Sequence, residues 1–345
     1  MVKYIVAIIL FGVIILFHEW GHFLLAKANG IRVNEFCLGL GPTIVGFTKG
    51  ETKYSLKLFP IGGACIMEGE DEESDDSRSF QKKSVWARIS VVAAGPVFNF
   101  ILAFLFAVII IACIGVSKPV IGDVVENSPA QEAGIQAGDE IVKINRKQIH
   151  FYQEISMYTL FHDGDPVEVT YERDGARYTT ELTPAYDEER GGYLYGVYAA
   201  PGYTKLGPGE TIVYGVWQVK FWIQYTVRSL EMLVTNQVSF NDLSGPVGIV
   251  KTIGDTYEQS LTDGYFYVFL NMLNLGILLS ANLGVMNLLP IPALDGGRLV
   301  FLVIEAIRGK RISSEKEGMV HFIGLMCLFA LMAVIMFNDV RKLFL

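Results

Sequence analysis

The chain has 345 residues, of which 51% are hydrophobic and 19% are charged, and its mean hydropathy is positive. Roughly a quarter of the residues of soluble proteins are charged. The lower charged fraction of this chain therefore favours a membrane protein. The formal net charge is −8, and the sequence contains no stripe of basic residues, so nucleic acid is not an expected partner. The cysteines at 37, 65, 113 and 327 form no CxxC pair, which argues against a disulfide framework and against a sulfur-ligated zinc site.

Four apolar stretches are long enough to cross a bilayer, which requires about 20 residues. We predict spans over residues 1–28, 88–116, 264–308 and 318–338. The third span is interrupted between Asn287 and Pro292. The first stretch could instead be the hydrophobic region of a signal peptide, but no small-residue cleavage site follows it. The fold class is therefore expected to be a polytopic α-helical membrane protein whose termini lie on the same side.

The lysines and arginines near the ends of the spans set the expected orientation. They are concentrated in 29–87 and between the third and fourth spans, so these loops should be cytoplasmic. The segment 117–186 should then be extracytoplasmic, and its short apolar runs separated by turn residues predict a small β-rich domain. Segment 205–238 keeps one face polar, which predicts an amphipathic helix on the outer surface of the lipid bilayer.

The first span contains the motif His18-Glu19-Trp20-Gly21-His22. On a helix, residues four apart share a face, so both imidazoles could bind one zinc ion with Glu19 beside it. Charged side chains near the centre of a spanning helix cost roughly 2.5–3.5 kcal/mol each, so they normally serve a function. The alternative is that the span ends early and this polar cluster extends into the cytoplasm, since Lys27 and Asn29 follow soon after.

Asp295 is the expected third zinc ligand. It follows the break in the third span and precedes Gly296-Gly297. Irregular backbone at membrane depth is tolerated only inside the protein or beside a water-filled cavity, and catalytic zinc usually has three protein ligands plus water. Taken alone, such an aspartate would more often cap a helix. With zinc-activated water, Glu19 would act as the general base.

The His18–His22 motif and the segment Asn287–Arg298, with several further segments in the same order, resemble the site-2 protease family of intramembrane zinc metalloproteases. The further matching segments are Gly39–Pro42, Lys57–Gly63, Ala94–Asn99 and Ser244–Ile249. This resemblance implies zinc bound by His18, His22 and Asp295, with Glu19 as catalytic base. It also implies regulated intramembrane proteolysis of single-span membrane proteins in the bacterial cytoplasmic membrane. Anti-sigma factors and signal-peptide remnants are the two substrate classes that it suggests.

The resemblance also implies residues that bind substrate. Gly39 and Gly41 would belong to a β-hairpin within 29–87 that dips into the membrane and pairs with an unwound substrate. Asn282 and Asn287 would lie near the substrate strand. Ordinary turns are the alternative for the two glycines. The family usually has Phe where this chain has Leu40, which leaves substrate preference open.

Segment 117–186 resembles a single PDZ domain, which would bind a peptide or the ectodomain of a substrate as an added strand. A non-catalytic scaffold carrying this domain is one rival function. A transporter is another, because broken helices with polar residues also mark ion paths. The complete set of metal ligands and a general base favours the hydrolase.

Overall fold

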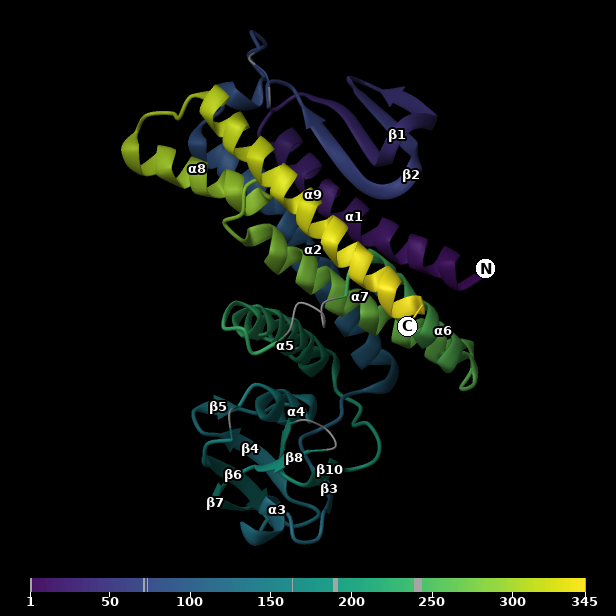
Figure 1. The fold of residues 1–345 in the computed structure, drawn as a ribbon, viewed down its shortest axis with the longest axis vertical. Helices are drawn as coiled ribbons and strands as arrows, with labels where there is room; N and C mark the ends of the chain where they lie inside the picture. The colour runs from purple at the N-terminus through teal and green to yellow at the C-terminus, as the bar shows by residue number, and fades with distance from the viewer. Residues whose placement is uncertain are drawn as a thin grey trace. The chain divides into compact units, whose positions relative to one another are not determined.

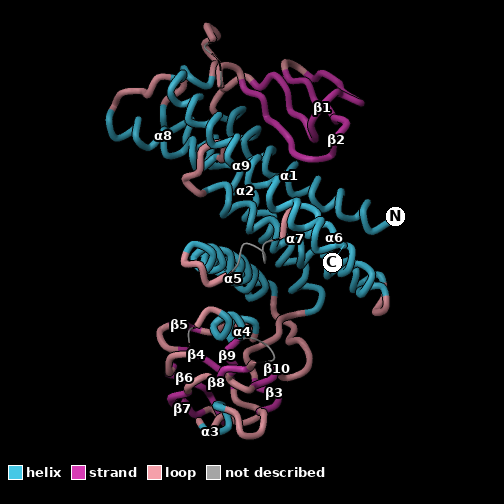
Figure 2. The backbone as a smooth tube through the Cα atoms, viewed as in Figure 1, coloured by secondary structure: helices cyan, strands magenta, loops and turns pink. Residues whose placement is uncertain are grey.

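The computed structural model describes residues 2–344 except 71, 73, 163, 189–191 and 239–243. It divides into two compact units, one formed by Met1–Phe106 with Ser229–Leu345 and the other by Ala107–Arg228. The first unit is mainly helical and the second contains most of the strands (Figures 1 and 2). Each unit is described below by itself.

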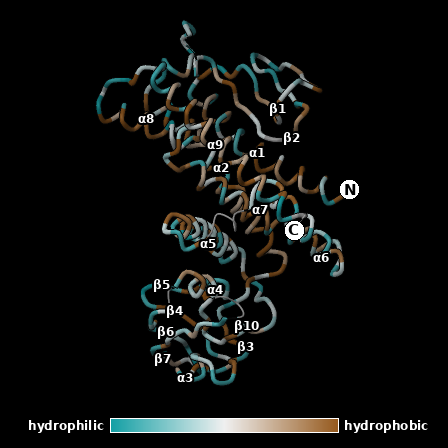
Figure 3. The backbone as a smooth tube through the Cα atoms, viewed as in Figure 1, coloured by the Kyte–Doolittle hydropathy of each residue, from teal (hydrophilic) through white to brown (hydrophobic). Residues whose placement is uncertain are grey.

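Four helices of the described residues are long and apolar enough to cross a membrane. They are α1 (Val2–Ala28), α2 (Val85–Ile114), α7 (Tyr265–Leu288) and α9 (Ser314–Phe344). Figure 3 shows hydrophobic residues along much of their length. Because a helix satisfies its own backbone hydrogen bonds, such segments suit a medium that lacks water. Each helix overlaps one of the four predicted spans, but α7 covers only the first part of the third, predicted over 264–308.

Three further helical segments belong to the first unit: η1 (Phe80–Lys82), α6 (Pro246–Leu261) and α8 (Asp295–Arg308). Helix α6 was not among the predicted elements. Its N-terminal N–H groups have a partner from another helix, because Asp339 of α9 accepts from Gly245 N and Gly248 N at 3.1 and 2.8 Å. The first four N–H groups of a helix have no partner within the helix, so this carboxylate stabilises the start of α6.

A bent sheet is formed by two long strands, β1 (Val33–Lys49) and β2 (Thr52–Met67), beside α1 (Figure 1). The first part of β1, residues 33–38, pairs with 63–67 on one side and with 53–56 on the other. The second part of β1, residues 43–49, pairs with 52–57. Segment 63–67 therefore forms an edge of the sheet, and β1 bends between its two paired parts.

Two apolar clusters flank the motif of α1. One joins α1 to α2, α6 and α7, and the other joins the end of α1 to the sheet, α2 and α8. The first contains Ala7, Leu10, Ile14, Leu102, Ile253, Val268 and Met272. The second contains Ala26, Ile31, Val33, Cys65, Met67, Phe80, Val91, Val92 and Leu302. Since His18 and His22 lie between Ile14 and Ala26, packing on both sides holds this part of α1 in place.

The second unit has a separate core. Its main sheet has the order β5–β4–β6–β7, and β3 pairs with β10. The strands are β3 (Ile121–Val124), β4 (Glu140–Ile144), β5 (Lys147–Gln148), β6 (Val167–Arg173), β7 (Ala176–Leu182), β8 (Ala185–Asp187), β9 (Gly192–Leu194) and β10 (Val197–Ala199). The β structure thus extends past the predicted boundary at residue 186, because β10 returns to pair with β3.

The helices of this unit are α3 (Pro129–Glu132), α4 (Gln153–Leu160) and the larger part of α5 (Pro208–Val234). Phe221 of α5 packs against Phe151 and Met157 in a buried cluster. Elsewhere on α5, Ile212 and Val216 are exposed, 54% each. The placement of this helix on a membrane surface, expected for 205–238, stays a prediction.

Candidate metal centre

The His18 and His22 side chains come from successive turns of α1 and are both buried. Their rings lie at 84° with centroids 4.9 Å apart. This is the arrangement that residues four apart adopt on one helix face. The helix continues to Ala28 without interruption, so the polar motif lies within α1 and not beyond its end.

Asp295 is brought to the histidines by the break between α7 and α8. The chain leaves helical geometry at Leu289, and Ala293 has a φ of +77°. The Ala293 N–H donates to His321 Nδ1 of α9 at 2.8 Å, which fixes this strained residue. Asp295 is the first residue of α8, and within the described part of the chain no side chain caps that helix, whose N-cap residue is Leu294. The alternative role as a helix cap therefore does not apply.

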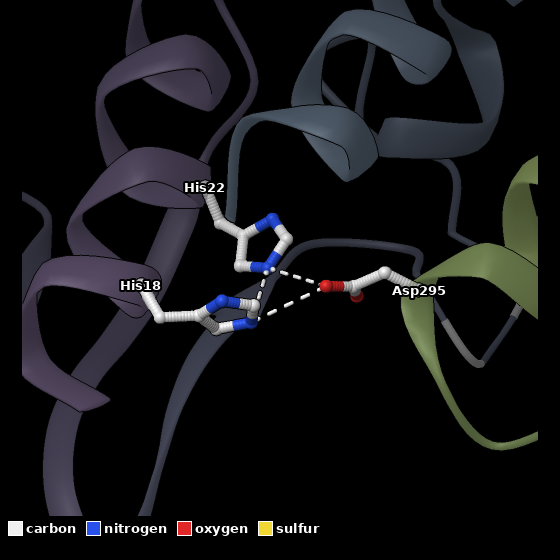
Figure 4. Close-up of side chains that lie close together, drawn as sticks. All are labelled: His18, His22 and Asp295. Atoms are coloured by element: carbon white, nitrogen blue, oxygen red, sulfur yellow. Dashed lines mark hydrogen bonds and ion pairs between the residues drawn. The ribbon is translucent and has the colours of Figure 1, made fainter. Parts of the chain in front are cut away.

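The three predicted ligands converge (Figure 4). Asp295 Oδ2 lies 3.2 Å from His18 Nε2 and 3.4 Å from His22 Nε2, and the two Nε2 atoms are 3.3 Å apart. A tetrahedral zinc ion with bonds of about 2.0 Å holds its ligand atoms about 3.3 Å apart. The three atoms are therefore spaced as three of the four ligands of a tetrahedral zinc ion would be.

The hydrogen bonding of the triangle also fits a cation. Asp295 Oδ2 is buried and has no hydrogen-bond partner among the described residues, although two imidazole nitrogens lie beside it. Buried polar atoms normally have partners. Two imidazole nitrogens and a carboxylate that direct lone pairs toward one point are a donor set suited to zinc.

Glu19 lies beside this triangle, half-buried on α1. The backbone of Cys65 in β2 hydrogen-bonds its carboxylate. Gly63 is also close, since a Cβ at this position would lie 2.9 Å from Glu19 Cγ. The edge segment of the sheet therefore holds the predicted base next to the metal ligands.

Helix α2 contacts the same two rings, which the sequence analysis did not predict. His22 Nδ1 donates to the Val91 carbonyl at 2.9 Å, and the Asn99 amide lies 3.0 Å from His18 Nδ1. Between these residues, a Cβ at Gly95 would lie 2.3 Å from His22 Nε2. The spacing of Val91, Gly95 and Asn99 by four residues is a signal that could have indicated a shared face.

The predicted substrate-binding residues occupy different positions. Asn287 Nδ2 lies 3.5 Å from His18 Nε2, at the margin of the metal centre. Asn282 is half-buried on α7, more than one turn earlier. Gly39 and Gly41 both have a φ of +91° and lie where β1 bends. A Cβ at Gly39 would lie 2.5 Å from the Phe59 carbonyl oxygen, so glycine is required by both conformation and space.

Comparison with known proteins gives a consistent family. The chain matches the model of peptidase family M50 over residues 6–331. It is 40% identical to a Clostridium acetobutylicum protein named as a zinc metalloprotease, over 97% of this chain and 96% of that protein. It is 33% identical to the zinc metalloprotease RasP of Geobacillus kaustophilus, over 98% of this chain and 97% of the relative. It is 32% identical to the regulator of sigma-W protease RasP of Bacillus subtilis, over 98% of both chains.

One solved structure, the PDZ domain of an SdrC-like protein from Listeria monocytogenes, aligns with 24% of this chain and 87% of its own. The identity is 24% and the TM-score is 0.22, so this likeness carries no argument here. The family match, in contrast, spans nearly the whole chain and includes every residue of the metal centre. The chain therefore belongs to peptidase family M50, the site-2 protease family, and is a zinc metallopeptidase.

Proposed function

We propose that this enzyme cleaves single-span membrane proteins within the bilayer, with zinc held by His18, His22 and Asp295 and with Glu19 as the general base. One observation carries the proposal: three ligand atoms from α1 and α8 lie within 3.4 Å of one another, beside Glu19. A non-catalytic scaffold or a transporter would not need this combination of ligands and base.

The chemistry divides between the metal and the protein. Bound zinc would lower the pKa of a water molecule and polarise the scissile carbonyl. Glu19 would remove a proton from that water and pass it to the nitrogen of the leaving amine. The Cys65 backbone and the close approach of Gly63 restrict the Glu19 side chain, so that its carboxylate is oriented before substrate arrives.

The depth of the centre supports cleavage inside the membrane. His18 lies about 15 Å from the end of α1 at Ala28, at 1.5 Å per residue. The hydrocarbon core of a bilayer is about 30 Å thick. With the predicted orientation, the termini are extracytoplasmic and the metal centre lies toward the cytoplasmic side of the bacterial inner membrane.

Substrate must be extended at the cleavage site, because the peptide bonds of a helix are shielded by its own hydrogen bonds. The β1–β2 sheet would dip into the membrane and pair with this extended segment. The 63–67 edge is the best candidate for that pairing, since it is next to Glu19, and strand addition would satisfy backbone groups freed from the helix. Gly39 and Gly41 would shape the sheet, while Asn282 and Asn287 would contact the substrate strand.

The β-rich unit would act as a single extracytoplasmic PDZ domain that binds a peptide or a substrate ectodomain. Its motif segments include Ser128-Pro129-Ala130, where the Ser128 hydroxyl accepts from Gln131 N and caps α3. Helix α5 would lie on the outer membrane surface with Ile212 and Val216 toward lipid. The name of the B. subtilis relative refers to sigma-W regulation, which favours anti-sigma factors over signal-peptide remnants as substrates.

The direct test is cleavage of a single-span substrate by purified enzyme in detergent. Glu19→Gln keeps the size of the side chain but cannot accept the proton, so we expect the rate to fall by at least about 10²-fold with zinc content unchanged. Full activity of Glu19→Gln would remove Glu19 as the base. Cleavage only of soluble peptides, and never of the membrane-embedded segment, would contradict the intramembrane reaction.

A further inference from the structure

Helix α2 holds each zinc-binding ring at the nitrogen that faces away from the metal centre. Val91, Gly95 and Asn99 lie on one face of α2, four residues apart. Val91 contacts His22, Asn99 contacts His18, and Gly95 leaves room for both rings. About two turns of α2 thus face the two histidines, which lie about one turn apart on α1.

The contact with Val91 fixes the tautomer of His22. A backbone carbonyl can only accept, so His22 Nδ1 carries the proton and Nε2 presents its lone pair toward Asp295. This is the form of histidine that binds a metal through Nε2. The same requirement applies to His18, whose Nε2 also faces Asp295.

His18 therefore needs an acceptor at Nδ1 when metal is bound, and Asn99 is the group within reach. The amide nitrogen of Asn99 faces Nδ1 at 3.0 Å, whereas its Oδ1 is buried and finds no hydrogen-bond partner among the residues that the structure describes. The O and N atoms of an asparagine are assigned from their hydrogen bonds. A half-turn of the amide about Cβ–Cγ brings Oδ1 to His18 Nδ1.

We propose that Asn99 is a positioning residue for zinc, accepting a hydrogen bond from His18 Nδ1–H through Oδ1 in the metal-bound enzyme. This inference rests on the proposed ligand set. An amide suits both states of the site, because its N–H₂ can donate to Nδ1 when His18 carries its proton on Nε2. Groups behind a metal-binding histidine commonly fix its orientation and raise its basicity.

The position of Asn99 is itself fixed. Its side chain has no exposed surface, and its backbone oxygen accepts from the Ser280 hydroxyl of α7 at 2.8 Å. Ser280 is also fully buried. This bond holds the Asn99 turn of α2 against α7 without involving the side-chain amide of Asn99. Removing the Ser280 hydroxyl therefore provides a matched control for packing alone.

The test is the zinc dissociation constant of the full chain in detergent, measured by competition with a chromophoric chelator. Asn99→Leu has similar size but no acceptor, and we expect zinc to bind about 10–100-fold more weakly. Asn99→Asp retains an acceptor and should retain most of the affinity. Equal losses in both variants would overturn the acceptor role, as would parental affinity in Asn99→Leu. Asn99→Ala replaces the leucine variant if that protein does not fold.

Two controls separate the possible causes. Ser280→Ala disturbs the same helix contact through the backbone oxygen only, so its zinc affinity should equal that of the parent. A loss as large as that of Asn99→Leu would assign the effect to packing and overturn the inference. Asp295→Ala tests the ligand set itself. If Asp295→Ala loses zinc while Asn99→Leu does not, only the role of Asn99 fails, and if Asp295→Ala keeps parental affinity, the proposed metal centre fails.

Discussion

Two glycines where α1 and α2 meet are as important to the candidate metal centre as its proposed ligands. A Cβ at Gly95 would lie 2.3 Å from His22 Nε2, and a Cβ at Gly21 would lie 2.5 Å from the Ala94 carbonyl oxygen. Both distances are shorter than any contact that packed atoms tolerate. Helices α1 and α2 therefore approach closely enough for Val91 and Asn99 to reach the imidazoles, as small residues allow between membrane helices.

Gly95→Ala should accordingly disrupt the zinc site. The added methyl group meets His22 Nε2 itself, so α1 and α2 must separate or the His22 ring must rotate away. We expect loss of most bound zinc and of activity, measured by metal analysis and substrate cleavage. Gly318→Ala in α9 is a matched control, because nothing lies within 4 Å of its Cβ position. Parental zinc content in Gly95→Ala would contradict this packing.

That His18, His22 and Asp295 come together could be expected from the sequence because their signals are local. His18 and His22 have the spacing of one helix face, and Asp295 follows a break marked by two prolines. The contacts of Val91 and Asn99 could not be predicted in the same way. They depend on the register between α1 and α2, which is set by the packing of two helices far apart in the chain.

Helix α8 carries Asp295 and is joined to α2 by a partly buried ion pair. Arg88 of α2 is 5% exposed and donates to both carboxylate oxygens of Glu305, at 2.5 and 3.1 Å. A second pair joins Arg298 of α8 to Glu70. Paired and hydrogen-bonded charges of this kind are costly to break singly, because one charge then remains buried without a partner.

A double-mutant cycle tests this connection. Arg88→Leu alone should destabilise the protein by about 3 kcal/mol, since Glu305 is left unpaired. The double variant Arg88→Leu with Glu305→Leu should recover much of that loss. Thermal unfolding of the four proteins in the same detergent gives the comparison. A double variant less stable than Arg88→Leu alone would contradict the pairing.

Helix α6 shows why some elements could not be predicted. It is short, it does not have the apolar length of a span, and the group that caps it comes from Asp339, more than 90 residues later. The sequence offered Pro246 as a first-turn residue, which is a weak signal by itself. Predicting α6 would have required knowing that Asp339 of α9 packs against its start.

The whole molecule combines an apolar helical unit with a β-rich unit that has its own core. In the β-rich unit, the fully buried carboxylate of Asp139 accepts from Arg173 Nε at 2.6 Å and from Nη2 at 2.7 Å. This paired charge and the continuous core of that unit indicate that it is a stable module. The turn residues of 117–186 indicate β structure, but the strands of this unit extend to Ala199.

The proposed orientation predicts which surfaces can be reached from outside the cell. In a variant without its native cysteines, a new cysteine at Arg146 should react with a membrane-impermeant maleimide in intact spheroplasts. A cysteine at Lys49, which is also exposed in the structure, should react only after the membrane is opened. The opposite pattern would reverse the orientation and place the β-rich unit in the cytoplasm.

The most direct measurement is X-ray absorption at the zinc edge of the purified enzyme. We expect a first shell of nitrogen and oxygen atoms at about 2.0 Å, with two imidazole ligands and no sulfur. In Asp295→Ala, the signal should weaken with the zinc content, because one of the three protein ligands is lost. A sulfur ligand in the parent, or an unchanged spectrum and zinc content in Asp295→Ala, would contradict a metal centre built from His18, His22 and Asp295.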